Sequence, residues 1–190
     1  MSTTILWSMN KMVRIRQRKT LSIFIAFIDL EKAFDCIDRN LLLYRLLCHN
    51  IDGKFYNTIK RIYTDTSSCL KINSMFTDWF NVLSGVRQGD NLSPTLFGLF
   101  INDLAKHIQN LNIGVKVGQD KISIFLFADD MVLVSENEHD LHKLLNAMLE
   151  WTNKWRLKVN IAKSKIVHFR KNRSNRTQFE FKYGQDSLDI

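Results

Sequence analysis

Two adjacent acidic residues, Asp129 and Asp130, lie between two short apolar segments of the 190-residue chain. The segment before them, 122–127, is rich in β-branched and aromatic residues, and the segment after them, 131–134, is apolar throughout. Both compositions are typical of β-strands in a protein core. Because only two or three residues separate the segments, we predict a β-hairpin that carries both carboxylates at its tip.

Paired carboxylates at a hairpin tip have two interpretations. Aspartate is a common turn residue, and the tip would then be a solvated turn without a ligand. Alternatively, the pair binds a metal ion. Two unit charges about 4 Å apart repel each other by about 4 kcal/mol at an effective dielectric constant of about 20. A divalent cation turns this repulsion into attraction, and Mg²⁺ is commonly held by one or two carboxylates together with phosphate oxygens. The metal hypothesis predicts a further carboxylate at another strand end.

Asp29 is in such a position. The run 21–30 is almost continuously apolar, as expected of a strand buried on both faces, and Asp29 lies near its end. An aspartate at this point is costly unless it faces a cleft, a partner or an ion. Asp35 is interpreted as a turn or capping residue, and Asp38 is predicted to be the N-cap of the next helix.

The polar segment 84–94 also has a composition that suits a ligand. Gly85 and Gly89 allow the backbone to approach a bound molecule closely. Ser93 is predicted to be an N-cap and Pro94 the first residue of a helix over 95–109. Two interpretations stay open: an ordinary connection with a good cap, or a loop that faces a substrate.

The other patterns predict an α+β fold, and the length is that of one domain. Further helices are expected over 3–13, after Asp38, over 55–62 and after Asn137. Further strands are expected over 67–72, 77–83, 115–117, 166–169 and around 179–183.

Composition limits the partners and the compartment. A net charge of +8 suits a polyanionic partner. The three cysteines, Cys36, Cys48 and Cys69, form neither a disulfide framework nor a metal knuckle, which fits a reducing compartment. We find no signal peptide and no apolar run near the ~20 residues that span a bilayer. The sequence therefore predicts a protein of the nucleus or cytoplasm with no membrane partner.

Taken together, the motifs resemble the reverse transcriptases of non-LTR (LINE-type) retrotransposons. The matching segments are Phe-Ile-Asp-Leu-Glu-Lys-Ala-Phe-Asp at 27–35, Ser-Gly-Val-Arg-Gln-Gly-Asp at 84–90 with Leu-Ser-Pro at 92–94, and Phe-Ala-Asp-Asp at 127–130. Leu-Lys-Val-Asn at 157–160 with Lys-Ser-Lys at 163–165 is similar to the family's fourth palm motif. Four motifs in this order are far more specific than any of them alone.

The resemblance implies a fragment of a right-hand polymerase. Its palm would be an antiparallel sheet backed by helices, with the carboxylates on the open face. The reverse transcriptase domain would occupy 1–170 as palm and truncated fingers. Residues 171–190 would be a basic tail leading toward a primer grip and thumb, and neither a thumb nor an endonuclease domain is expected within these 190 residues.

The resemblance also implies site residues. Asp29 and Asp129 would hold two Mg²⁺ ions, or Mn²⁺, with Asp130 completing the acidic cluster. These carboxylates should therefore converge in the structure. Such an enzyme extends a DNA primer on an RNA template from deoxynucleoside triphosphates by two-metal in-line phosphoryl transfer.

Five residues are implied to bind the substrates. Phe34 would crowd the 2′ position of the sugar and favour deoxynucleotides, and Gln88 and Gly89 would lie against the nucleotide and template. Leu30 and Arg87 belong to the same substrate-binding set.

One lysine is implied to protonate the pyrophosphate leaving group. Lys163 is the match for this role, with Lys158 and Lys165 as alternatives.

Three other functions are compatible with parts of the sequence. The first is a catalytically inactive palm relic that only binds nucleic acid. The second is a nucleotide cyclase, but the Gly-Gly-Asp/Glu signature of those enzymes is absent. The third, a globular protein with an acidic turn, leaves the four ordered motifs unexplained.

Overall fold

The computed structural model describes residues 3–18, 22–170 and 175–190. The chain separates into two compact units, the first formed by 1–31 with 101–190 and the second by 32–100. This differs from the single domain expected from the length. The chain leaves the first unit after Glu31 and returns to it at Ile101, inside helix α4 (Ser93–Gln109).

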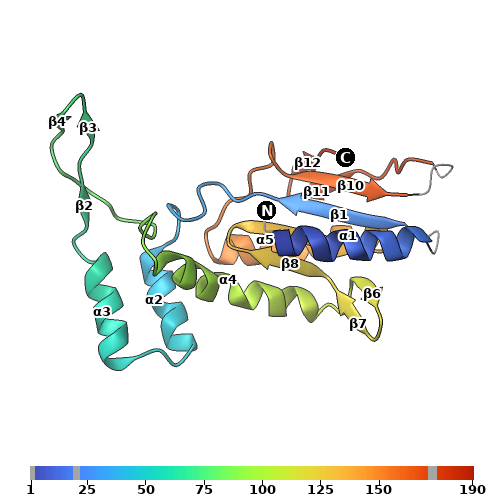
Figure 1. Cartoon of the computed structure of the whole chain (residues 1–190), viewed down its shortest axis with the longest axis horizontal. Helices are drawn as coiled ribbons and strands as arrows, with labels where there is room; N and C mark the ends of the chain where they lie inside the picture. Colours follow the sequence, from blue (N-terminus) through green and yellow to red (C-terminus); the bar gives the residue numbers. More distant parts are fainter. Residues whose placement is uncertain (1–2, 19–21, 171–174) are drawn as a thin grey trace. The chain divides into compact units, whose positions relative to one another are not determined.

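The first unit is built on a four-stranded antiparallel sheet (Figure 1). Its strand order is β10-β1-β9-β8, so the two strands nearest in space to β1 are distant from it in sequence. The strands are β1 (Ile23–Ile28), β8 (Ile124–Phe127), β9 (Asp130–Ser135) and β10 (Lys165–Phe169). The antiparallel sheet of an α+β protein is thereby confirmed.

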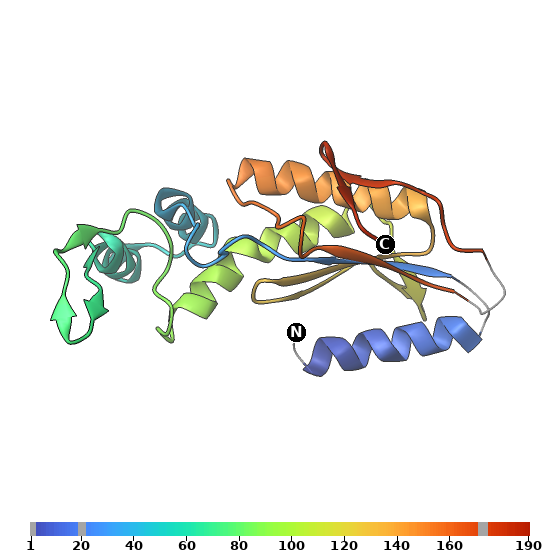
Figure 2. The same cartoon turned by 90° about the horizontal axis from the view of Figure 1, so that it is seen from above.

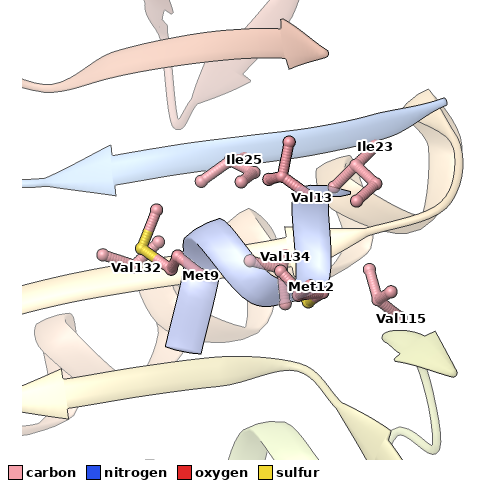
Figure 3. Packing of buried hydrophobic residues seen from close by; sticks show 8 residues of the cluster. All are labelled: Met9, Met12, Val13, Ile23, Ile25, Val115, Val132 and Val134. Carbon is pink, nitrogen blue, oxygen red and sulfur yellow. The ribbon is translucent and has the colours of Figure 1, made fainter. Parts of the chain in front are cut away.

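Helix α1 (Thr3–Arg18) covers one face of this sheet. Because side chains alternate along a strand, Ile25 of β1 and Val134 of β9, which are paired in register, point to the same face. Figure 3 shows the side chains of α1 lying against them. The buried cluster consists of Met9, Met12, Val13, Ile23, Ile25, Val115, Val132 and Val134.

Helix α5 (Glu138–Lys154) covers the opposite face (Figure 2). Asn137 is its N-cap, as predicted, and its side chain accepts the backbone N–H of Asp140 at 2.9 Å. The sequence predicts an apolar face for this helix, and its residues are all buried: Leu141, Leu144, Leu145, Met148 and Trp155. Burial of the sheet on both faces explains why β1 is almost continuously apolar. The resemblance predicted that one face of the sheet is open. In the structure, α1 covers part of the face that α5 does not cover.

Two hairpins complete the first unit. One joins β6 (Val115–Val117) to β7 (Asp120–Ile122). The other joins β11 (Phe181–Tyr183) to β12 (Asp186–Leu188), within the segment predicted to be a basic tail. Residues 171–174 of that segment lie outside the described residues.

The second of these hairpins belongs to the core. Phe181 is fully buried, and the Tyr183 hydroxyl lies 2.5 Å from the Thr152 hydroxyl of α5. Burial raises the pKa of Tyr183 to about 12. The alternation of aromatic and polar residues at 179–183, which predicted a strand, explains why the segment forms a two-stranded sheet with one side packed against α5.

The second unit contains two complete helices, the N-terminal part of α4 and two very short sheets. Helix α2 (Arg39–Cys48) is capped as predicted by Asp38, whose carboxylate accepts the N–H groups of Asn40 and Leu41, and helix α3 (Gly53–Tyr63) follows. The strand pairs are β2 (Ser67–Ser68) with β5 (Phe80–Asn81), and β3 (Lys71–Ile72) with β4 (Met75–Phe76).

These strands are shorter than the predicted strands 67–72 and 77–83. Many apolar side chains of this segment are exposed: Leu70, Ile72, Met75, Phe76, Trp79, Phe80 and Leu83. A two-stranded hairpin without a buried face is only marginally stabilised, so the ladder stays short.

Unfolding of the first unit should depend on the protonation of His168. Its ring stacks on Phe24 with centroids 4.1 Å apart, and neither ring nitrogen has a hydrogen-bond partner among the described residues. Burial, more than the neighbouring Arg170, lowers the pKa of His168 below its ordinary value. As the pH falls below about 6.5, the unfolded chain therefore binds a proton that the folded chain resists.

We predict that the free energy of unfolding decreases as the pH falls from 7 toward 5, and that His168→Phe reduces this dependence. Urea denaturation at several pH values measures it. His107→Asn, which changes an exposed histidine, is the control and should leave the pH dependence as it is in the parent. An unchanged pH dependence in the His168 variant would show that the charge on this ring does not govern acid stability.

Candidate active site

Strand pairing in the first unit brings Asp29 and Asp130 together. Ile28 of β1 is paired with Met131 of β9, so the same antiparallel register continued by one residue sets Asp29 opposite Asp130 on the same face. Both aspartates line a cavity of about 220 Å³ together with Lys163. The other residues around this cavity are Phe27, Ile28, Met131 and Val132. Two of the three predicted carboxylates thus share one cavity.

Asp129 lies at the exposed tip of the hairpin. Phe127 pairs with Asp130, so the turn consists of Ala128 and Asp129 alone, as the spacing predicted. Ala128 has a φ of 52°, in the left-handed region that an L side chain rarely adopts. Asp129 is not part of the cavity lining, and across residues 3–18, 22–170 and 175–190 no three His, Cys, Asp or Glu side chains are grouped as a metal site. The predicted acidic cluster is therefore a pair with a third carboxylate beside it in the turn.

The three candidate lysines have different neighbours. The Lys163 ammonium lies 4.0 Å from Oδ2 of Asp29. The Lys165 ammonium pairs with Asp189 at 2.6 Å and lowers the pKa of that carboxyl. The backbone carbonyl of Lys158 accepts the N–H of Glu31. Of the three lysines, Lys163 is the one whose ammonium is paired with Asp29 among the described residues. Because its side chain is 71% exposed, the pair with Asp29 contributes no more than about 1 kcal/mol.

Leu30 is in the core of the first unit. Its side chain is 5% exposed, and its backbone forms an isolated antiparallel bridge with Val159. The side chain implied to bind substrate is thus buried beside the acidic pair.

The remaining predicted residues line one cavity of the second unit. Phe34, Arg87, Gln88 and Gly89 border a space of about 510 Å³ at the N-terminal end of α4. Phe34 stacks on Phe97 with ring centroids 4.8 Å apart, which restricts its ring orientation. The cavity is completed by Asp90, Asn91, Ser93 and Pro94. The polar segment 84–94, for which two interpretations were open, therefore borders a cavity.

Asp35 holds this loop in place. Its carboxylate accepts a hydrogen bond from Nε2 of Gln88 at 2.9 Å, and its carbonyl accepts the Ser84 hydroxyl at 3.0 Å. The neighbouring carbonyl of Phe34 accepts the N–H of Val86 at 2.8 Å. Sequence reasoning interpreted Asp35 only as a turn or cap, because no local pattern links residues 53 positions apart.

Arg39 is a second residue that sequence reasoning missed. Its guanidinium donates to the carbonyls of Tyr63, Val82 and Gly85 at 3.0, 2.6 and 2.9 Å, and to the Thr66 hydroxyl at 2.5 Å. Burial lowers the pKa of Arg39. These contacts join the end of α3 to the start of the polar loop. Arg39 follows the N-cap Asp38, and nothing in the sequence marks it as more than a residue of the first helical turn.

Solved structures show which fold the chain has. Apo telomerase from Candida Tropicalis, truncated from the C-terminal domain, aligns with a TM-score of 0.69 at 17% identity, over 94% of this chain and 37% of that one. Telomerase from Candida albicans in complex with a fragment of telomeric RNA aligns with a TM-score of 0.62 at 14% identity, over 95% of this chain and 32% of that one. The fold is shared with these polymerases.

Sequence comparison then identifies the family. Residues 3–184 match the family described as reverse transcriptase (RNA-dependent DNA polymerase), and the chain belongs to this family. The match extends beyond residue 170 into the β11–β12 hairpin. The membership predicted from the four motifs is thereby confirmed.

The curated proteins similar to this chain include Pol polyproteins and RNA-directed DNA polymerases of mobile elements. The Pol polyprotein of the type-1 element R2 from Nasonia vitripennis is 31% identical over 138 residues, which is 73% of this chain. That of R2DM from Drosophila melanogaster is 32% identical over 142 residues, or 75% of the chain. The mobile element jockey of the same fly encodes an RNA-directed DNA polymerase that is 25% identical over 158 residues, or 80% of the chain. The aligned regions are 13%, 13% and 16% of these relatives.

Among the described residues, no helix combines the length and apolar character needed to cross a bilayer.

Gly85 should be essential for the loop geometry. It has a φ of 81°, and a Cβ built on it would lie 2.7 Å from the carbonyl oxygen of Asp35. Gly89 has a similar φ of 85°, but nothing lies within 4 Å of its Cβ position. Alanine at Gly89 therefore introduces backbone strain only, whereas alanine at Gly85 adds a steric clash. We predict that Gly89→Ala lowers the free energy of unfolding by about 1 kcal/mol and Gly85→Ala by at least ~2 kcal/mol more.

Urea denaturation of both variants measures the difference. Equal losses for Gly85→Ala and Gly89→Ala would contradict close packing of the loop against Asp35.

Proposed function

We propose that this chain is an RNA-directed DNA polymerase domain that adds deoxynucleotides to the 3′ end of a primer paired with an RNA template. The observation that carries the proposal is the shared cavity of Asp29 and Asp130, which are about a hundred positions apart in the sequence. Family membership supports the reaction class, and two carboxylates that line one cavity are the kind of group that binds the metal ions of phosphoryl transfer. The first unit, with its antiparallel sheet, would be the palm.

The donor set fits divalent cations. Mg²⁺ takes one or two carboxylates and completes its octahedron with water and substrate phosphate oxygens, so a pair of aspartates is sufficient protein ligation. Asp29 and Asp130 would hold the ions in the cavity, and Asp129 would join them from the turn beside it. When bound, two Mg²⁺ or Mn²⁺ ions lower the pKa of the primer hydroxyl and neutralise charge on the leaving pyrophosphate.

Residues of the chain would then position the nucleotide and protonate the leaving pyrophosphate. Lys163 would give its ammonium proton to the leaving pyrophosphate, from its place beside Asp29. Gln88, oriented by Asp35, and Gly89, with an open Cβ position, would contact the nucleotide. Phe34, braced by Phe97, would exclude a 2′-hydroxyl. The net charge of +8 would favour the template and primer backbones.

The nucleus or cytoplasm is the proposed compartment, and it agrees with the three cysteines, which are all free thiols.

Nucleotide incorporation should depend on Asp129. We expect Asp129→Asn to lower primer extension by the purified chain at least about 100-fold, since metal-ion stabilisation of a phosphoryl-transfer transition state amounts to several kcal/mol. The fold should survive, because Asp129 is exposed in a turn. The assay uses a primed RNA template with Mg²⁺ or Mn²⁺, and circular dichroism checks folding.

Asp120→Asn, which changes another exposed aspartate of the first unit, is the matched control and should extend primers as the parent does. Extension by folded Asp129→Asn at the parental rate would refute the metal role. A parent that only binds RNA, with a log–log salt slope of about −0.7 to −0.9 per phosphate contact and no extension, would identify an inactive relic.

Sugar selection should depend on Phe34. Phe34→Val shortens the side chain at the cavity wall and is expected to raise ribonucleotide incorporation relative to deoxynucleotide incorporation about tenfold or more. Single-nucleotide extension with each substrate gives the two kcat/KM values and their ratio. Phe55→Val, at an exposed position of α3, is the control. A ratio that stays at the parental value would assign sugar selection to another residue.

A further inference from the structure

The backbone of Asp29 is held by a single short segment of the first unit. The N–H of Asp29 donates to the Ser164 hydroxyl at 3.1 Å. The carbonyl of Asp29 accepts the N–H of Asn160 at 2.8 Å. Both backbone polar groups of this aspartate are therefore bound by residues 160–164, about 130 positions away in the sequence.

The Ser164 hydroxyl is fixed on both sides. While it accepts from Asp29, it donates to the carbonyl of Asn160 at 2.8 Å, and Ser164 is completely buried. The Ser164 N–H donates to the same carbonyl at 2.9 Å. With donor and acceptor both engaged and no water contact, this hydroxyl has one orientation, and that orientation points a lone pair at Asp29.

The same turn presents Lys163. The N–H of Lys163 donates to the side-chain oxygen of Asn160 at 3.3 Å, and its ammonium lies 4.0 Å from the Asp29 carboxylate. The turn between Asn160 and Ser164 therefore fixes the backbone of Asp29 and the backbone of Lys163 relative to each other.

Asp29 needs this support because the regular ladder stops before it. The last paired residue of β1 with β9 is Ile28, and the following residues, Leu30 and Glu31, contact Val159 and Lys158 instead. The direction of the Asp29 carboxylate then depends on the 160–164 turn more than on β9.

We propose that Ser164 is a positioning residue that sets the Asp29 carboxylate for metal binding and keeps it in register with Lys163. The inference rests on the proposed function, because it assigns Asp29 as a ligand. Residues that orient metal ligands typically change metal affinity or activity by 10–100-fold when they are replaced. A misplacement of about 1 Å at a reacting group is enough for a loss of this size.

A merely structural serine is available for comparison. Ser135, at the far end of β9 from Asp130, is also completely buried and donates its hydroxyl to a carbonyl, that of Asn137, at 2.7 Å. Ser135→Ala and Ser164→Ala each remove one buried hydroxyl that donates to a main-chain carbonyl. Only the second also removes the acceptor of the Asp29 N–H.

The test measures Mn²⁺ binding by electron paramagnetic resonance of the free ion, alongside primer extension. We expect Ser164→Ala and Ser164→Cys, in which a thiol is a poor acceptor, to weaken Mn²⁺ binding about tenfold or more. Ser164→Thr, which keeps the hydroxyl, should stay within about threefold of the parent, and so should Ser135→Ala. Thermal melts establish that each chain is folded. Should Ser164→Ala not fold, the pair Ser164→Cys and Ser164→Thr decides the result.

Two sets of results would overturn the inference, and they differ. In the first set, Asp29→Asn loses Mn²⁺ binding, so the parent binds the ion through Asp29, but the hydroxyl-free Ser164 variants bind Mn²⁺ as well as the parent does. This result refutes the positioning role alone. So does a loss in Ser135→Ala that matches Ser164→Ala. A parent that does not bind Mn²⁺, or an Asp29→Asn chain that binds as well as the parent, refutes the proposed function and this inference with it.

Discussion

Antiparallel pairing of β1 with β9 is the constraint on which the acidic site depends. The sum of paired residue numbers is constant along an antiparallel ladder. The ladder that pairs Ile25 with Val134 ends at Ile28 with Met131, and it therefore brings the strand ends that carry Asp29 and Asp130 next to each other. A slip of one residue would turn every side chain of β1 to the opposite face, and Ile23 and Ile25 would lose their contacts with α1. The apolar contacts with α1 and α5 thus maintain the register, and the register maintains the acidic pair.

Beyond the ladder, the site relies on hydrogen bonds between segments that are distant in sequence. Asp29 is held by the 160–164 turn, Gln88 by Asp35, and the start of the polar loop by Arg39. In each case one side is a backbone group or a short side chain with few rotamers, which limits the conformational entropy lost on ordering. These contacts place functional groups with more accuracy than the apolar core alone would give.

Much of this architecture was predictable from local pattern. The apolar run of β1, the apolar segments on both sides of Asp129, and the caps Asp38 and Asn137 all predicted the elements that form, because each depends on nearest neighbours along the chain. The contacts of Arg39 and Ser164 were not predictable, because a hydrogen bond to a distant carbonyl leaves no periodic signal. The strands at 67–83 were predicted too long, since β-propensity implies a buried face that this segment lacks among the described residues.

The exposed apolar hairpin region at 67–83 also affects the behaviour of the chain in solution. With seven large apolar side chains exposed there, solubility has to come from charge repulsion, which the net charge of +8 provides at low ionic strength. Added salt screens that repulsion within a Debye length of about 8 Å at 0.15 M, and it does not weaken apolar contact. Concentrated salt is commonly used to remove nucleic acid from basic proteins. For this chain it would promote self-association through the exposed apolar side chains at 67–83.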